Sequence, residues 1–407
     1  MKLFKKNCSL INDNNTINDI THDNFVQYLI ENKLFIAPKP ISEGNYGYIN
    51  ILYDKRTCID VLYIIKSEKS TKQYKIGIPI TNNHYLLKIY KTNPIPMGIL
   101  ESYIEYILGQ KLPHGSINMD ENNIYINPLS KNLVINDFNS YGITLNKGDY
   151  FVSLPFVQEF LLMCETSKFL TNPTIYCIHF TDIYNLIKVG NEYKMIMEYI
   201  CCGNLNIDGN THLWGEFYSP ELFLSIFFAI ATYQTKGICH YDLHVGNILY
   251  IIVNEKYNPV WNCKNLLDYD YFEYTIRGIS FYIPRPKIII KIVDWGLGMK
   301  YSQPKIINAN FNILTNLNRS KYLPVYDIAM IILSVNSKFQ NKFHSGFMDK
   351  LTQIIFNKPP TLDLPIVILN ELNNVNITAE DMILKYGLFD HLRDYPMSDN
   401  IIKVGNI

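Results

Sequence analysis

The most restrictive feature of the sequence is a polar cluster set between two apolar segments. Residues 221–237, ELFLSIFFAIATYQTKG, form an apolar run of helix length that ends in Gly237, a residue type that often closes helices. Residues 248–253, ILYIIV, have the composition of a buried strand. The cluster between them, HYDLHVGN, contains Asp242 and Asn247. This order predicts either a surface turn or a functional loop held by rigid neighbours.

Three other segments combine apolar surroundings with one chemically capable feature. Gly44 and Gly47 lie in a turn between strand-like runs, where small residues let backbone N–H groups approach phosphate oxygens. Lys88 lies inside the apolar run LLKIY, where a buried ammonium needs a partner. Asp294 ends the apolar run IIIKIV before a glycine turn, and Mg²⁺ prefers such hard oxygen ligands. Each alone has an ordinary reading as a hairpin, an edge strand or a turn, so only their order together is informative.

Bulk properties narrow the classes of protein. A chain of 407 residues, 48% of them hydrophobic, predicts two or three domains or two lobes with a real core. Net charge is zero, which gives no electrostatic reason to expect a nucleic acid or a membrane as partner. The eight cysteines form no CxxC pair, so neither a zinc site nor a disulfide framework is indicated. The longest apolar stretch is too short to cross a bilayer, and we expect a soluble, intracellular protein.

Periodicity predicts a β-rich part followed by an α-rich part, which places the chain in the α+β class. Two stretches, at about 113–150 and 254–280, are expected to be insertions. The predicted strands are 41–53, 84–91 and 192–200, and the predicted helices are 96–112, 156–170, 221–237 and most of the chain beyond 324.

In this order the segments resemble the eukaryotic-type protein kinase family. ISEGNYGYI resembles the glycine-rich loop, YLLKIYK the strand with the phosphate-binding lysine, and MIMEYICCGNL the hinge. HYDLHVGNIL resembles the catalytic loop and KIVDWGLGMK the magnesium loop. PVYDIAMIILS resembles the helix whose aspartate, Asp327, braces the catalytic loop, and NITAEDMILKYGLF the closing helices. The matches run from about residue 41 to 390.

The resemblance implies a bilobal fold with a β-rich N-lobe and an α-helical C-lobe. The expected parts are an N-terminal extension at 1–36, the N-lobe at 37–200, the C-lobe at 201–395 and a C-terminal tail at 396–407. Composition and divergence are similar to kinases of large DNA viruses, such as giant viruses and poxviruses, which would place the protein in the host cytoplasm or the virion.

The resemblance also implies roles for the matched residues. Asp242 would position and deprotonate the substrate hydroxyl, Lys88 would hold the α- and β-phosphates, and His244 stands where a lysine usually contacts the transferred phosphate. Asn247 and Asp294 would hold Mg²⁺. ATP would be bound by Ser42, Gly44, Gly47, Ile49, Leu86, Lys88, Met197 as gatekeeper, the backbone of Glu198 and Ile200, and Leu249.

The glutamate that orients Lys88 stays open among three candidates. Glu101 and Glu105 lie one turn apart on the predicted helix 96–112, and Glu101 borders its apolar stripe more closely, so we favour Glu101. Glu159 ranks lower, because it would need a far longer insertion after Lys88.

The sequence departs from the family at several positions. Tyr241 replaces the arginine usual before the catalytic aspartate, Trp295 replaces a phenylalanine, and His244 gives a DLHxxN loop of the haspin type. The A-P-E segment and its partner arginine are both missing, which is self-consistent because they normally form one buried ion pair. Since Tyr241 cannot pair with a phosphate as arginine does, we expect an enzyme that is active as synthesised.

The leading functional hypothesis is an ATP-dependent protein kinase that acts on a Ser or Thr hydroxyl, with ATP and a protein substrate as partners and Mg²⁺ as cofactor. A small-molecule kinase is an alternative, because DLHxxN followed by DW also resembles aminoglycoside phosphotransferases. A pseudokinase that only binds is the third hypothesis.

Overall fold

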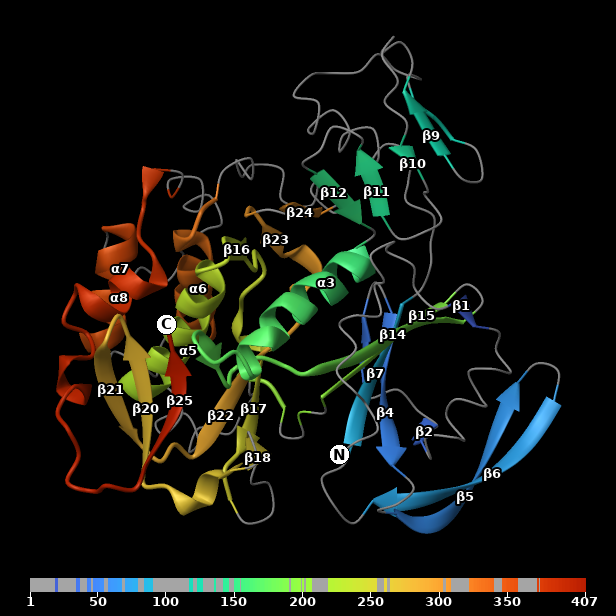
Figure 1. The fold of residues 1–407 in the computed structure, drawn as a ribbon, viewed down its shortest axis with the longest axis horizontal. Coiled ribbons are helices and arrows are strands. Elements are labelled where there is room, and N and C mark those ends of the chain that lie inside the picture. Colours follow the sequence, from blue (N-terminus) through green and yellow to red (C-terminus); the bar gives the residue numbers. More distant parts are fainter. Residues whose placement is uncertain are drawn as a thin grey trace. The chain divides into compact units, whose positions relative to one another are not determined.

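The computed structural model describes residues 19–20, 34–36, 42–44, 47–54, 58–67, 70–79, 84–90, 117–119, 123–126, 135–136, 142–145, 150–153, 155–189, 192–198, 200, 203–206, 219–254, 260–261, 264–302, 305–308, 322–339, 346–357, 372 and 374–407. The chain divides into two compact units (Figure 1). The first comprises Met1–Leu100, Pro113–Ile143 and Asp182–Tyr199, and the second comprises Glu101–Leu112, Thr144–Thr181 and Ile200–Ile407. The lobe boundaries expected from the sequence stay predictions.

A seven-stranded sheet dominates the described part of the first unit. Its central strands are rich in Ile, Leu, Tyr and Met, which fit a pleated surface. The order is β1 (Asp19–Ile20), β14 (Ile183–Val189), β15 (Glu192–Glu198), β7 (His84–Tyr90), β4 (Gly47–Asp54) and β2 (Leu34–Ile36), with β3 (Ser42–Gly44) paired to β4. The strands predicted at 41–53, 84–91 and 192–200 are confirmed, including the glycine turn, where Gly44 pairs with Gly47.

Shorter pairings complete the described first unit. β5 (Cys58–Ser67) and β6 (Ser70–Pro79) form a hairpin of ten residue pairs, longer than the short strands expected there. The predicted insertion at about 113–150 contains the short strands β8 (Ile117–Met119), β9 (Asn123–Ile126), β10 (Ile135–Asn136) and β11 (Gly142–Leu145). The predicted helix 96–112, with Glu101 and Glu105, lies outside the described residues.

The second unit is built around one buried helix, α5 (Pro220–Gln234). Ser219 accepts a hydrogen bond from the backbone N–H of Leu222, and Pro220 occupies the first turn, where its missing N–H costs nothing. Every residue from Leu222 to Tyr233 is buried. The helix predicted at 221–237 is confirmed, but it ends at Gln234 with Thr235 as its C-cap. Gly237, expected to close the helix, lies two residues further on in the turn that follows, where its φ of +61° suits glycine.

Four other helices of the second unit are described. α3 (Pro155–Ser167) confirms the helix predicted at 156–170 and continues into the short 3₁₀ turn η3 (Lys168–Leu170). The chain beyond residue 324 forms α6 (Val325–Phe339), α7 (Gly346–Phe356) and α8 (Ala379–Leu384), as the helical signal there predicts. Thr378 and Asp381 form a capping box at the start of α8, with hydrogen bonds in both directions.

Two antiparallel ladders bring the polar cluster and Asp294 together. β17 (Ile248–Ile252) pairs with β22 (Ile288–Ile292), and the ladder opens with Ile248 opposite Ile292. β16 (Ile238–Cys239) pairs with β23 (Met299–Lys300), and β23 pairs with β24 (Lys305–Asn308). β24 pairs in turn with β12 (Tyr150–Ser153). The cluster therefore leaves β16 and enters β17, while Asp294 lies between their partner strands β22 and β23.

A four-stranded sheet forms where the sequence predicted an insertion and a tail. Its order is β13 (Tyr176–Cys177), β25 (Ile401–Asn406), β20 (Tyr271–Ile276) and β21 (Ile279–Pro284). β20 and β21 form a tight hairpin, with positive φ at Arg277 and Gly278, and the chain's C-terminal strand lies inside the sheet. The small pair β18 (Val260–Trp261) and β19 (Lys264–Asn265) precedes the hairpin.

The described residues are a mixture of sheets and packed helices, so the predicted α+β class is confirmed. Among these residues no helix is both long and apolar enough to cross a membrane.

Candidate functional site

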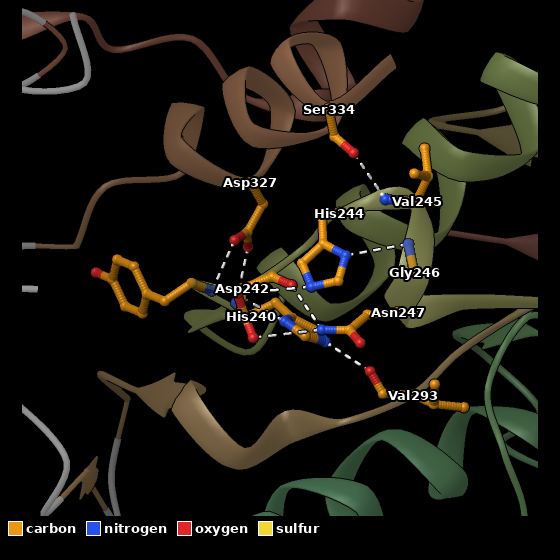
Figure 2. Close-up of polar contacts among 10 residues, drawn as sticks. His240, Asp242, His244, Val245, Gly246, Asn247, Val293, Asp327 and Ser334 are labelled. Atoms are coloured by element: carbon orange, nitrogen blue, oxygen red, sulfur yellow. Dashed lines mark hydrogen bonds and ion pairs between the residues drawn. The ribbon is translucent and has the colours of Figure 1, made fainter. Parts of the chain in front are cut away.

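The carboxylate of Asp327 holds the start of the polar cluster in place. Asp327 is fully buried at the start of α6. One carboxylate oxygen accepts the backbone N–H of Tyr241 and the other accepts that of His240, each at 2.8 Å (Figure 2). The second oxygen also accepts the hydroxyl of Tyr233 at 2.8 Å. Burial raises the pKa of Asp327, and these three donors offset part of that rise. The bracing role that the resemblance implies for Asp327 matches these contacts.

A second anchor on α6 was not foreseen. The hydroxyl of Ser334 accepts the backbone N–H of Val245 at 3.0 Å, so α6 holds the polar cluster at both ends (Figure 2). Ser334 lies seven residues after Asp327, which places both on one face of the helix. That spacing was the available signal in the sequence.

His240 links the cluster to the strand before Asp294. Its Nε2 bonds to the backbone carbonyl of Val293 at 2.9 Å, and its Nδ1 accepts the N–H of Asp242 at 3.3 Å (Figure 2). Trp295 packs on the same imidazole, with ring centroids 4.6 Å apart, and is fully buried, as expected of an aromatic plug. The imidazole of His240 is held at both ring nitrogens and at one face, so it fixes the position of Asp242 relative to Val293.

Asp242 and Asn247 are joined by their own side chains. Nδ2 of Asn247 donates to the backbone carbonyl of Asp242 at 2.8 Å and to its carboxylate at 3.4 Å. These bonds fix the orientation of the amide, so its oxygen is directed away from the groups that its nitrogen contacts. Val293 donates its N–H to the carbonyl of Asn247 at 3.1 Å, which brings the next residue, Asp294, to the same place.

His244 caps the 3₁₀ turn η4 (Val245–Asn247) inside the cluster. Its Nδ1 accepts the N–H of Gly246 at 3.0 Å, while Nε2 lies 3.9 Å from the carboxylate of Asp242. A Cβ at Gly246 would approach the His244 ring to 2.7 Å, so only glycine leaves the ring in this position. The side chains of His244 and Asp242 are partly exposed, at 42% and 36%.

Tyr241 inside the polar cluster and Asp294 beside it have left-handed backbones, a conformation that is unfavourable for residues other than glycine. Tyr241 and Asp294 both have a φ of +62°. A non-glycine residue pays roughly 1 kcal/mol or more for this conformation, and such residues occur often at functional sites. The bonds from Asp327 to Tyr241 and from His240 to Val293 provide the compensation.

The electrostatics of Asp242 follow from its neighbours. Burial raises the pKa of Asp242, and the charge of Asp294 acts in the same direction. His240, His244 and the Asn247 amide act in the opposite direction without cancelling the rise.

Helix α3 brings a third carboxylate to this region, from Glu159. Glu159 is buried, with 3% of the residue's surface exposed. Glu159 borders Gly296 in the 3₁₀ turn η6 (Trp295–Leu297): a Cβ built on that glycine would lie 3.9 Å from Oε2 of Glu159 and 3.5 Å from Oδ1 of Asp294. Both residues belong to the second unit. The sequence analysis ranked Glu159 behind Glu101, because Glu159 would need a far longer insertion after Lys88.

The expected nucleotide-binding residues of the first unit form two rows across three strands. Lys88 on β7 pairs with Ile49 on β4 and with Met195 on β15. Leu86 pairs in the same way with Ile51 and Met197. Leu86 and Lys88 are two residues apart on β7, so they lie on the same face of the sheet.

The remaining predicted nucleotide contacts are distributed over both units. Ser42 and Gly44 lie on β3, and Gly47 begins β4. Met197 is buried at the end of β15, and the N–H of Glu198 donates to the carbonyl of Asp182 at 2.8 Å. Ile200 and Leu249 belong to the second unit, with Ile200 buried and Leu249 on β17.

The predicted metal ligands fit Mg²⁺ by chemistry, although the described residues contain no group of three His, Cys, Asp or Glu side chains suited to a metal. Asn247 offers an amide oxygen and Asp294 a carboxylate, and both are hard ligands. Mg²⁺ typically takes only one or two protein ligands, because phosphates and water supply the rest.

No protein-family model matches this chain, and no curated protein matches it either. The functional assignment therefore depends on the site itself.

Proposed function

We propose that the protein transfers the γ-phosphoryl group of Mg-ATP to a Ser or Thr hydroxyl of a protein substrate. One observation carries the proposal, namely that Asp242 and Asn247 are hydrogen-bonded to each other. Asp294 lies next to them, because the preceding residue, Val293, donates its N–H to the carbonyl of Asn247. Phosphoryl transfer needs a group that positions the acceptor hydroxyl beside ligands for Mg²⁺, and these three residues have the required chemistry.

Each residue has a defined task in this proposal. Asp242 accepts the proton of the acceptor hydroxyl and orients it, and its raised pKa brings its basicity closer to the working pH. His244, half exposed beside Asp242, places a donor where negative charge builds up on the transferred group. When bound, Mg²⁺ would neutralise phosphate charge, held by the amide oxygen of Asn247 and the carboxylate of Asp294.

The orienting glutamate is assigned differently from the sequence prediction. We prefer Glu159 to Glu101, because Glu159 is buried on a helix that packs against the Asp294 turn. A carboxylate in such surroundings needs a specific partner of opposite charge or a hydrogen-bond donor. The phosphate-binding role of Lys88 stays a prediction of the resemblance, as do the contacts of the nucleotide with Ser42, Gly44 and Gly47.

The bilobal kinase fold is part of the same proposal. A sheet-rich first unit and a second unit built on helices support it. The hydrogen bonds from Asp327 to the backbone at His240 and Tyr241 support it further, because they give the polar cluster the rigid base that a catalytic loop needs.

The test has two stages. Mg-ATP should raise the melting temperature of the purified protein, since a ligand of the folded state stabilises it by mass action. Radiolabel from γ-labelled ATP is then followed on a peptide array and on a panel of aminoglycosides and small alcohols. Label on peptides supports the proposal, label on small alcohols alone makes the protein a small-molecule kinase, and binding without transfer makes it a pseudokinase.

A further inference from the structure

Helix α3 lies along the segment that follows Asp294 in a regular register. Glu159 borders Gly296, Leu162 borders Gly298, and Glu165 bonds to Lys300. A Cβ at Gly298 would approach Cδ1 of Leu162 to 2.7 Å. From one contact to the next, the chain advances three residues along the helix and two residues along the segment. All three contacts come from one face of the helix.

The last of these contacts is an ion pair between a buried lysine and a partly exposed glutamate. Nζ of Lys300 lies 2.9 Å from Oε2 of Glu165, and the Lys300 side chain is only 7% exposed. The other carboxylate oxygen of Glu165 bonds to the exposed Lys168. Both lysines lower the pKa of Glu165 against the effect of its burial. A buried ammonium is costly without a partner, so Lys300 needs Glu165 opposite it.

Lys300 also connects α3 to the catalytic cluster through its backbone. It pairs with Ile238 on β16, and Met299 pairs with Cys239, the residue before His240. The ion pair thus joins the helix of Glu159 to the strands that hold both Asp242 and Asp294.

We propose that Lys300 is a positioning residue, whose ion pair with Glu165 fixes the register of α3 along residues 296–300 and so keeps Glu159 beside Asp294. This inference rests on the proposed function, in which Asp294 would hold Mg²⁺ and Glu159 would orient Lys88. The apolar contact of Leu162 with Gly298 tolerates sliding, whereas an ion pair is specific in distance and direction. A slip by one helical residue would move Glu159 by about 1.5 Å.

Lys300→Met is the informative variant. It removes the ammonium and keeps an unbranched apolar side chain for the buried site, and Glu165 retains Lys168. Glu165→Gln would instead leave the buried ammonium of Lys300 without its charge partner. Lys300→Arg is the conservative rescue, and Lys350→Met, at an exposed position on α7, is the matched control.

The experiment measures the Mg²⁺ concentration for half-maximal phosphoryl transfer at saturating ATP, together with the melting temperature. We expect Lys300→Met to need roughly tenfold more Mg²⁺ and to turn over more slowly, Lys300→Arg to recover most of both, and Lys350→Met to behave as wild type. A purely structural role would lower the melting temperature only. Wild-type Mg²⁺ dependence in Lys300→Met overturns the inference, whatever its stability.

Hydrogen exchange without nucleotide separates failure of this inference from failure of the proposed function. Amides of residues 294–300 should exchange faster in Lys300→Met than in wild type, while those of α5 stay unchanged. If wild-type protein transfers no phosphate, the proposed function fails and exchange alone decides the positioning role. Unchanged exchange at 294–300 would then refute that role as well.

Discussion

At the scale of single residues, one buried carboxylate determines the shape of the site. Asp327 accepts three hydrogen bonds, two of them from the backbone of consecutive residues, His240 and Tyr241. Tyr241 has a left-handed backbone at this point, with a φ of +62°. A group that only accepts hydrogen bonds is needed at this point, because every partner is a donor.

Asp327→Asn should therefore be strongly destabilising. The substitution directs an NH₂ group at backbone donors and leaves buried N–H groups unsatisfied, at a cost of roughly 3 kcal/mol in the free energy of unfolding. Tyr233→Phe, which removes one donor of the same carboxylate, should cost about 1 kcal/mol. Urea denaturation of both variants measures the difference. Equal stability of the Asn variant and wild type would contradict this account of Asp327.

The pH dependence of activity should report the surroundings of Asp242. Its carboxylate must be ionised to accept a proton, and its pKa is raised from 3.8, so activity should fall with decreasing pH earlier than for an exposed aspartate. The neighbouring His244 lowers that pKa. His244→Asn keeps an acceptor for the N–H of Gly246 but removes the imidazole, and it should move the acid limb of the kcat/KM profile to higher pH. A limb that stays or moves to lower pH would refute this coupling.

At the scale of elements, sequence patterns predicted those segments whose apolar periodicity is continuous. The helix at α5, the strands β7 and β15 and the cluster before β17 all follow from local composition. The hairpin of β20 and β21 had a signal, because YFEYTI and ISFYIP alternate around the two-residue turn Arg277–Gly278. The pairing of β25 with β20 had none, since a parallel contact over more than a hundred residues leaves no local pattern.

The C-terminal strand should be essential for folding of the second unit. A Cβ at Gly405 would lie 2.3 Å from Cε1 of Phe228, whose ring is fully buried on α5. Gly405→Ala should therefore destabilise the protein by about 1–3 kcal/mol through overpacking. Gly346→Ala is the matched control, because nothing lies within 4 Å of its Cβ and the residue begins α7. Thermal melts compare the two, and an unaffected Gly405→Ala protein would show that β25 is dispensable.

The segment after Asp294 should work without phosphorylation. The side chain of Tyr241 is buried, its hydroxyl bonds to that of Tyr301, and its ring packs on Tyr326. Tyr241 carries no positive charge that could pair with a phosphate, and its hydroxyl is bonded to the hydroxyl of Tyr301 in the segment itself.

Phosphatase treatment should accordingly leave activity within a small factor of the starting protein. The same is expected of a triple Ala variant at Ser302, Thr315 and Ser320, of which the latter two lie outside the described residues. A large loss that rephosphorylation restores would reveal another basic receptor and refute the expectation.

At the scale of the whole molecule, the sequence located the polar cluster better than the tertiary contacts that surround it. Asp242, Asn247 and Asp294 could be found because their polar side chains interrupt apolar runs. Glu159 was ranked behind Glu101 because it would need a far longer insertion after Lys88, and its position beside η6 is a tertiary contact that helical periodicity does not contain. Ser334 and Lys300 were missed for the same reason, since both act through partners distant in the chain.

The most direct test of the central claim compares turnover and nucleotide affinity in Asp242→Asn. Asp242 contacts the acceptor hydroxyl in the proposed reaction, whereas Asn247 and Asp294 hold the metal. Asp394→Asn, at an exposed position, is the control. The account predicts that Asp242→Asn binds Mg-ATP with nearly unchanged affinity while its turnover falls by a factor on the order of a hundred or more. Turnover comparable to wild type would contradict the claim that this cluster catalyses phosphoryl transfer.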